Sequence, residues 1–202
     1  MSSLKTLLDA GVPLWHLKIG EYLVTEEPIM VSTVLGSCVS VTFFHEPSQL
    51  AAIFHAMLPS QQLHREASLK EPGKFVDTAI ATILGEFSAH GVRTVQIQTK
   101  LFGGAFTIDP DRKTAIRNIV DVGAKNVEIA RQLLESHGLA PLKENILGQR
   151  GRKIFFYTAT GDVWLKYLSK TPIQDQALAY RRILGAAVNT LAPEAKDAKD
   201  LR

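Results

Sequence analysis

Residues 31–59 read VSTVLGSCVSVTFFHEPSQLAAIFHAMLP, and this stretch decides the fold. It contains two runs of strand-forming residues, 39–44 and 50–57, on either side of a polar connection at 46–48. Two such runs separated by a short turn-forming segment are typical of a β-hairpin. The sequence therefore predicts a hairpin, around which the remaining elements can be arranged.

Alternation of side chains along this hairpin brings the only cysteine near a histidine. If the chain reverses at Glu46-Pro47, Cys38 lies opposite His55 and both occupy one face of the hairpin. Directly opposed residues have Cβ atoms roughly 4.5–5.5 Å apart, a separation at which a thiol and an imidazole can share a proton. The other face then collects a continuous apolar set, which consists of Val39, Val41, Phe43, Leu50, Ala52 and Phe54.

A cysteine paired with a histidine can act as a nucleophile. The attacking species is the thiolate, and a base that removes the thiol proton supplies it at neutral pH. The hydroxyls of Ser32 and Thr33, on the preceding strand, are candidates to orient the imidazole. The residues alone also allow a structural interpretation, in which Cys38 is a small buried hydrophobe and His55 a structural group.

Composition describes one ordinary globular domain. The chain has 202 residues, a net charge of +3 and one cysteine, so it forms no internal disulfide and fits a reducing cytosol. It has no apolar run long enough to span a membrane and no convincing signal peptide, so we expect a cytoplasmic protein without membrane insertion. Its arginine pairs are not interleaved with aromatic residues, which argues against nucleic-acid binding.

The rest of the chain alternates irregularly between helical and strand patterns. Apolar residues at helical spacing predict helices over 75–87 and 127–134, the second as a scaffold element without chemistry of its own. Strands are expected over 92–99 and, as a second hairpin, over 154–159 and 163–168. This order of elements favours an α+β fold over a doubly wound parallel sheet.

Cofactor signals are weak. The glycine-rich segment 148–151 lacks the lysine and hydroxyl of a phosphate-binding loop, so no nucleotide is expected. The histidines at positions 45, 55 and 64, together with Cys38, match no familiar zinc spacing, so no metal is expected either. Gly103 and Gly104 could let the backbone approach a ligand or form a bulge, and the sequence leaves both roles open.

Several separate blocks of the sequence resemble one bacterial family, the CheD chemoreceptor glutamine deamidases. The resemblance covers about residues 15–168. Its blocks, in order, are TVLGSCV, FHAMLP, GKFVDTAI, KLFGGAF, VGAKNVEIARQLLESHGL and GRKIFFYTATGDVWLKYL. It implies two packed mixed sheets flanked by helices, an α/β/β/α sandwich.

The resemblance also implies an activity: hydrolysis of glutamine side chains in chemoreceptor helices to glutamate, with release of ammonia. Cys38 would be the nucleophile, His55 the base and a threonine the third member, which here is Thr33 with Ser32 as the alternate. The expected partners are methyl-accepting chemoreceptor helices and, for some members, a CheC-type phosphatase. A non-catalytic adaptor that binds receptors or the phosphatase is the alternative.

We expect the oxyanion to lie near the Gly36-Ser37 turn, with Gly103 and Gly104 in the same vicinity.

The expected organisation is an N-terminal extension (1–13), a CheD-like domain (14–170), a C-terminal helix (171–192) and a disordered tail (193–202).

Overall fold

The computed structural model describes residues 3–61, 71–106 and 122–168, all within one unit, Met1–Ser169. The predicted C-terminal helix and tail lie outside the described residues. The described part of the chain contains no helix long and apolar enough to cross a membrane. Its elements, in chain order, are α1 (Leu4–Asp9), β1 (Leu14–His16), β2 (Tyr22–Thr25), β3 (Met30–Leu35), β4 (Val39–His45), β5 (Leu50–Phe54), α2 (Val76–Ala89), a 3₁₀ turn (Thr94–Gln96), β6 (Gln98–Gly103), α3 (Val122–Ser136), β7 (Lys143–Ile146), β8 (Arg152–Tyr157) and β9 (Asp162–Tyr167).

The strands form two mixed sheets. The five-stranded sheet has the order β2-β5-β4-β6-β7 and the four-stranded sheet the order β1-β3-β8-β9. Each sheet contains one parallel pair, β6–β7 in the first and β1–β3 in the second, and its other pairs are antiparallel. The predicted α+β architecture with two packed mixed sheets is therefore confirmed.

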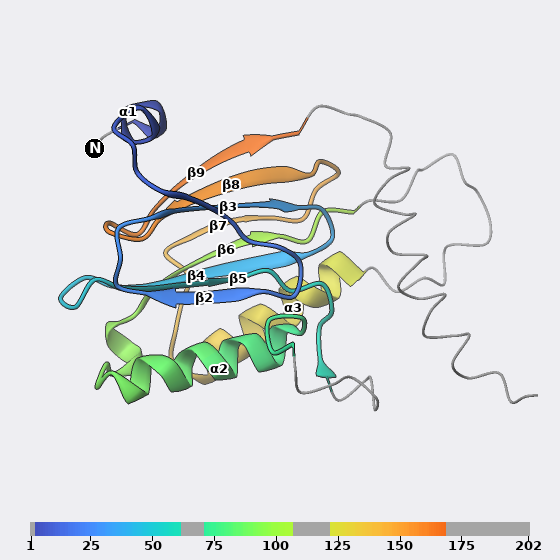
Figure 1. Ribbon diagram of the computed structural model, residues 1–202. Coiled ribbons are helices and arrows are strands. Elements are labelled where there is room, and N and C mark those ends of the chain that lie inside the picture. Colours follow the sequence, from blue (N-terminus) through green and yellow to red (C-terminus); the bar gives the residue numbers. More distant parts are fainter. Residues whose placement is uncertain (1–2, 62–70, 107–121, 169–202) are drawn as a thin grey trace, which may run out of the picture. The chain divides into compact units, whose positions relative to one another are not determined.

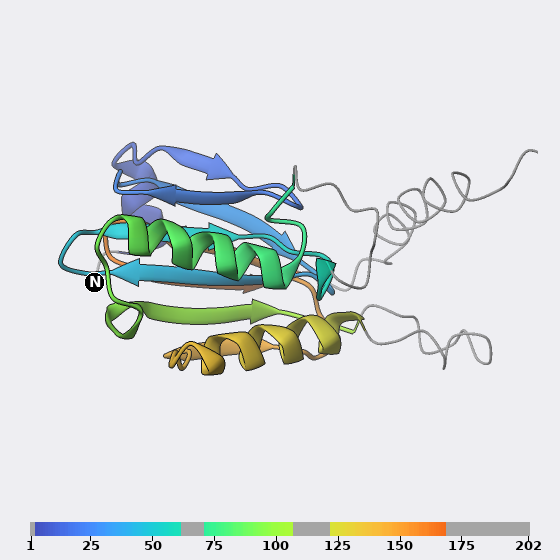
Figure 2. The ribbon, with the colours of Figure 1, turned by 90° about the horizontal axis from the view of Figure 1, so that it is seen from below.

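Both long helices of the described residues lie on the same side of the molecule. α2 and α3 cover the outer face of the five-stranded sheet, and the four-stranded sheet lies on its other face (Figures 1 and 2). The outer face of the four-stranded sheet carries no long helix within the described residues, because α1 has only six residues and none of them is buried. The described layers are thus helix, sheet and sheet, and a second helical layer is not among them.

The central hairpin forms, but with a longer turn than predicted. His45 pairs with Leu50 and Thr42 with Ile53, so the turn spans four residues and Gln49 adopts a positive φ of 54°. The same register continues at the Val39–Ala56 bridge. Each residue of β4 therefore pairs with a residue two positions later in the sequence than its predicted partner. Because side chains alternate with a period of two, this shift leaves every residue on its predicted face.

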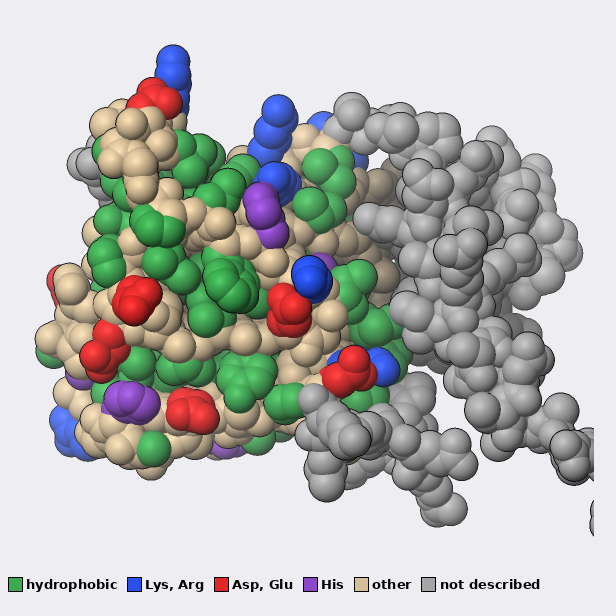
Figure 3. Space-filling view, viewed as in Figure 1, with side chains coloured by type: hydrophobic (Ala, Val, Ile, Leu, Met, Phe, Trp, Pro, Cys, Tyr) green, Lys and Arg blue, Asp and Glu red, His purple; other side chains and the backbone are tan. Residues whose placement is uncertain are grey.

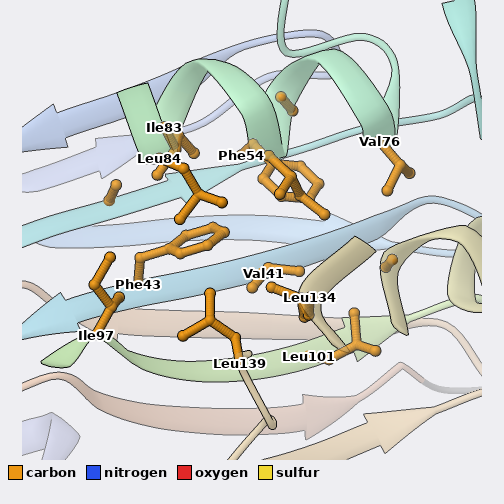
Figure 4. Packing of buried hydrophobic residues seen from close by; sticks show 14 of the residues in the cluster. Val41, Phe43, Phe54, Val76, Ile83, Leu84, Ile97, Leu101, Leu134 and Leu139 are labelled. Atoms are coloured by element: carbon orange, nitrogen blue, oxygen red, sulfur yellow. The ribbon is translucent and has the colours of Figure 1, made fainter. Parts of the chain in front are cut away.

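Each face of the hairpin packs into a different core. The predicted apolar face, which includes Val41, Phe43 and Phe54, packs against Ile83 of α2 and Leu134 of α3 (Figure 4). The opposite face meets the four-stranded sheet in a smaller apolar cluster. That cluster consists of Leu17, Val31, Leu35, Phe44, Ala51, Ile53, Phe102, Ile154 and Phe156, with Cys38 packed at its margin. Burial of each large apolar side chain stabilises the fold by about 1.5–3 kcal/mol.

The other predicted elements are largely confirmed. α2 begins one residue after the start of its predicted range, and α3 covers its predicted range in full. A glycine with positive φ follows each helix, Gly91 after α2 and Gly138 after α3. The second hairpin is β8–β9. The strand predicted over 92–99 is wrong, because a 3₁₀ turn occupies Thr94–Gln96 and leaves Val95 73% exposed. β6 begins only at Gln98 and runs into the glycine pair.

Candidate functional site

The cysteine lies in a three-residue loop between β3 and β4. The backbone carbonyls of this loop accept hydrogen bonds that hold the loop in place. Gly104 donates its N–H to the Cys38 carbonyl at 2.8 Å, and Ala105 donates to the Gly36 carbonyl at 2.8 Å. The Ser37 carbonyl accepts a side-chain N–H from Asn126 at 3.1 Å. All three loop carbonyls thus accept hydrogen bonds, two from the residues that follow β6 and one from α3. Cys38 is half-buried as a whole residue.

His55 is held by both its backbone and its ring. It follows β5, donates its N–H to the Glu21 carbonyl at 2.9 Å and accepts the Gly20 N–H at 2.8 Å. Its side chain is only 3% exposed, and its Nδ1 lies 2.6 Å from the Thr33 hydroxyl oxygen. The imidazole therefore has one ring nitrogen fixed by a buried hydroxyl of the facing sheet.

The hydrogen-bond directions around Thr33 fix the tautomer of His55. Thr33 donates its hydroxyl proton to the Leu17 carbonyl at 2.9 Å, so its oxygen accepts the proton carried by His55 Nδ1. Nε2 then carries no proton, and it has no hydrogen-bond partner among the described residues. A bare ring nitrogen whose opposite nitrogen is hydrogen-bonded is the form of histidine that can accept a proton.

Strand alternation separates the two candidate hydroxyls. Thr33 points from β3 toward the five-stranded sheet and reaches His55. Ser32 points to the other face, where its Oγ lies 2.7 Å from Nδ1 of His16 on β1. Of the two sequence-predicted third members, the structure brings Thr33 to the histidine and places Ser32 against a different one.

The observed register makes Cys38 and His55 diagonal neighbours. His55 lies across from Ser40, two residues beyond the cysteine, in a register that pairs Val39 with Ala56. Diagonal residues on one face are about 7–8 Å apart between Cα atoms, still within reach of long and aromatic side chains. The predicted direct opposition is wrong, but the predicted common face is correct.

Burial keeps both groups uncharged at neutral pH. It raises the pKa of the Cys38 thiol to about 12, although the residue's own backbone N–H acts in the opposite direction. Burial also lowers the pKa of His55 to about 4, against smaller opposing effects of the Leu17 carbonyl and the Glu21 carboxylate. The resting site therefore holds a thiol and a neutral imidazole instead of a thiolate–imidazolium pair.

The glycine pair serves the packing of the cysteine loop. A Cβ at Gly103 would lie 2.2 Å from the Cys38 carbonyl oxygen, and one at Gly104 would lie 2.4 Å from a methyl of Val127. Both glycines also have positive φ. Since the N–H of Gly104 is donated to Cys38, it is not available to a substrate. The pair lies beside the cysteine loop, and its observed role is close backbone approach.

Asn126 is a residue of the site that was not predicted from the sequence. The helix α3 was expected to be a scaffold, yet this residue is fully buried and donates Nδ2 to the carbonyls of Ser37 and Met57, each at 3.1 Å. The signal was present, because Asn126 is the polar member of the buried stripe of α3, which consists of Gly123, Asn126, Val127, Ala130 and Leu134. No group of three or more potential metal ligands occurs within the described ranges.

Fold and site together define an α+β protein with a free cysteine and a hydroxyl-bound histidine on one face of a hairpin, the residue types of cysteine hydrolases. Comparisons with known proteins specify the family. Residues 57–167 match the family model described as CheD chemotactic sensory transduction. This range begins two residues after His55.

Whole-chain relatives extend the match. A protein of Nitratidesulfovibrio vulgaris, named probable chemoreceptor glutamine deamidase CheD, is 48% identical over 165 residues, which are 82% of this chain and 82% of that protein. One of the same name from Oleidesulfovibrio alaskensis is 47% identical over 83% of this chain and 79% of its own length. A Geobacter sulfurreducens protein, named probable chemoreceptor glutamine deamidase CheD 2, is 42% identical over 79% of this chain and 93% of its own length. This chain belongs to the CheD family.

Among solved structures, Bacillus licheniformis hypothetical protein YfiH is similar with a TM-score of 0.40 and 17% identity, over 63% of this chain and 51% of that one.

Proposed function

We propose that this protein is a cysteine-dependent chemoreceptor glutamine deamidase. The observation that carries the proposal is the hydrogen-bonded series Leu17–Thr33–His55, which leaves Nε2 of the imidazole bare on the face that also carries Cys38. The names of the relatives supply the substrate, a glutamine side chain of a chemoreceptor.

The proposed reaction starts with a proton transfer to His55. Nε2 takes the thiol proton while Sγ of Cys38 attacks the carbonyl carbon of the glutamine side chain, which forms a C–S bond and an oxyanion. The imidazolium then gives that proton to the departing nitrogen, which leaves as ammonia, and a thioester remains. Water, deprotonated by Nε2, adds to the thioester carbonyl. Breakage of the C–S bond releases glutamate and restores the thiol.

The oxyanion is assigned to the backbone N–H groups of the cysteine loop. The three loop carbonyls, those of Gly36, Ser37 and Cys38, all accept hydrogen bonds from α3 or from the residues that follow β6. The N–H groups of Ser37 and Cys38 donate to no backbone carbonyl of the described residues. Loss of one such donor typically raises a barrier of this kind by about 2.7–4 kcal/mol.

Because the thiolate is not formed at rest, proton removal and attack on the amide belong to one step in this proposal. The depressed pKa of His55 keeps the base unprotonated across the neutral range. Thr33 keeps the ring in the tautomer that can accept at Nε2, a task that an aspartate or asparagine performs in other triads. A hydroxyl orients the ring without adding negative charge, so the site can stay neutral while buried.

The proposed partners are the cytoplasmic helices of methyl-accepting chemoreceptors and a CheC-type phosphatase, and the proposed location is the cytoplasm. Charged side chains of both signs are dispersed among apolar ones on the face shown in Figure 3, without one continuous basic patch there. A distributed surface of this kind suits a protein partner better than a nucleic acid.

Ammonia release from a purified cytoplasmic fragment of a chemoreceptor tests the proposal. Wild-type protein should release ammonia and convert the amide to an acid at specific glutamines, visible by mass spectrometry of the fragment. Cys38→Ala should abolish both signals while its thermal unfolding stays close to that of the wild type. Undiminished release by Cys38→Ala would end the proposal.

A non-catalytic adaptor is the second candidate, and one observation favours it: the raised pKa of Cys38 means a weakly reactive thiol in the resting protein. The two candidates differ in one measurement. An adaptor would bind the receptor fragment with equal affinity in wild-type and Cys38→Ala forms and would release no ammonia in either.

A further inference from the structure

We propose that Asn126 is a positioning residue that sets the separation between the nucleophile and the base. Its side-chain Nδ2 donates to the carbonyl of Ser37, the residue before Cys38, and to the carbonyl of Met57, two residues after His55. One amide group thus joins the two segments that carry the reacting side chains. This inference rests on the proposed function for its catalytic consequence.

The orientation of the Asn126 amide follows from its partners. Both carbonyls are acceptors, so the group between them must be the NH₂, which has two protons to donate. The reverse orientation would place three oxygens together and leave both carbonyls without a donor. The side chain is fully buried, and its Oδ1 has no partner in the described part of the chain.

The helix that carries Asn126 is itself fixed against the cysteine loop. A Cβ on Gly123 would lie 2.8 Å from the Gly104 carbonyl oxygen, so the backbone of α3 is in direct contact with the residue that follows β6. Gly104 in turn donates to the carbonyl of Cys38. Asn126 therefore extends from a rigid support, and its two bonds transmit the position of α3 to both sides of the site.

Loss of the amide should alter the Cys38–His55 separation and leave the fold in place. Displacement of a reacting group by about 1 Å typically costs about 100-fold in rate. We expect Asn126→Leu, which keeps the approximate volume and removes both donors, to lower kcat for the receptor fragment about 100-fold without raising KM. Asn126→Ala, which cannot overfill the site, should give the same loss if the leucine variant unfolds.

The decisive experiment measures alkylation of Cys38 by iodoacetamide at pH 7.5 in four proteins: wild type, Asn126→Leu, His55→Ala and the double variant. If Asn126 acts through the Cys38–His55 pair, its replacement should slow alkylation about tenfold or more in the wild type and leave the rate unchanged once His55 is absent. A merely structural role would slow alkylation equally in both backgrounds.

Thr99→Val provides a matched control, since Thr99 is also fully buried and its hydroxyl has no partner among the described residues. It should leave alkylation unchanged in both backgrounds. Equal effects of Asn126→Leu with and without His55, no effect in either, or a wild-type rate that does not depend on His55 would each overturn the inference. Because iodoacetamide is not a receptor, this result is independent of whether Cys38→Ala retains ammonia release, which would refute the proposed function instead.

Discussion

Replacement of Thr33 by valine removes one hydroxyl and keeps the shape of the side chain. In the wild type this hydroxyl accepts from His55 Nδ1 at 2.6 Å and donates to the Leu17 carbonyl at 2.9 Å, both in buried surroundings. Thr33→Val therefore leaves two buried polar groups without this partner. At about 1–3 kcal/mol for each unsatisfied group, the free energy of unfolding should fall by about 2–6 kcal/mol.

The catalytic effect follows from the tautomer. Without an acceptor beside Nδ1, the ring proton is better placed on Nε2, and a protonated Nε2 cannot accept the thiol proton. General-base assistance is typically worth about 10²–10⁴ in rate, so kcat should fall at least about 100-fold. Thr33→Ser, which keeps the hydroxyl, should retain most of the activity.

Two measurements check this reasoning: ammonia release from the receptor fragment, and ¹⁵N chemical shifts of His55 in histidine-labelled protein, which report the tautomer. Ser32→Ala is the matched control, because it removes the neighbouring hydroxyl, which lies beside His16 on the other face. Its kcat should stay within about twofold of the wild-type value, a change much smaller than the loss expected when general-base assistance is removed. A folded Thr33→Val protein with wild-type kcat, or a large loss in Ser32→Ala alone, would refute the assignment.

Three further predictions concern burial and backbone approach. The pKa of His55 is about 4 in the folded protein and about 6.5 in the unfolded chain, so the free energy of unfolding should fall by about 3 kcal/mol as the pH drops from 6.5 to 4. Urea unfolding of His55→Gln at several pH values should lack this fall. With its pKa at about 12, Cys38 should react with iodoacetamide much more slowly in native His55→Ala at pH 8 than in the same protein unfolded in urea, and equal rates would contradict its burial. Gly104→Ala should destabilise the protein far more than Gly148→Ala in thermal unfolding, since both glycines have positive φ but only the first has backbone and side-chain atoms within 3 Å of a new Cβ.

The faces of the central hairpin could be predicted from the sequence, whereas its register could not. A period of two separates Val41 and Phe43 from Cys38 and Ser40 whichever even shift the turn imposes. The turn length depends on Gln49, which adopts a left-handed conformation that nothing in its residue type requires. The prediction therefore placed His55 opposite Cys38 instead of Ser40, but on the correct face of the hairpin.

The sequence narrowed the hydroxyl that orients His55 to two residues, but it could not decide between them. Ser32 and Thr33 are adjacent hydroxyls, and the choice depends on which face of β3 meets the five-stranded sheet. That face is decided by Val31 and Leu35, which share the side of Thr33 and are fully buried between the sheets. The exposure of Val34 on the opposite side is consistent with this orientation, although its apolar character gave no sign of it in the sequence.

The contact between Asn126 and the cysteine loop could not be predicted from the sequence, because it joins three segments that are far apart along the chain. The two carbonyls that it binds lie 20 residues apart in the sequence, at Ser37 and Met57, and Asn126 itself lies 69 residues beyond the second. Close packing of Gly123 against Gly104 and the apolar stripe of α3 on the five-stranded sheet bring these three segments together. A polar residue in a buried helical stripe is nevertheless a usable signal, because burial of an amide costs free energy unless its hydrogen bonds are made.

A neutral resting site explains the choice of threonine as the orienting group. His55 and Thr33 are both buried, and a carboxylate in the place of the hydroxyl would add a buried charge that only a protonated imidazole could balance. Such a carboxylate would raise the pKa of His55, so the base would be protonated over more of the neutral range. With a hydroxyl the imidazole stays bare at Nε2 in the resting protein, and charge appears only when the thiol proton moves. Replacement of Thr33 by aspartate should therefore raise the pKa of His55, which a shift of its ¹⁵N titration to higher pH would detect, and an unchanged titration in the folded variant would contradict this account.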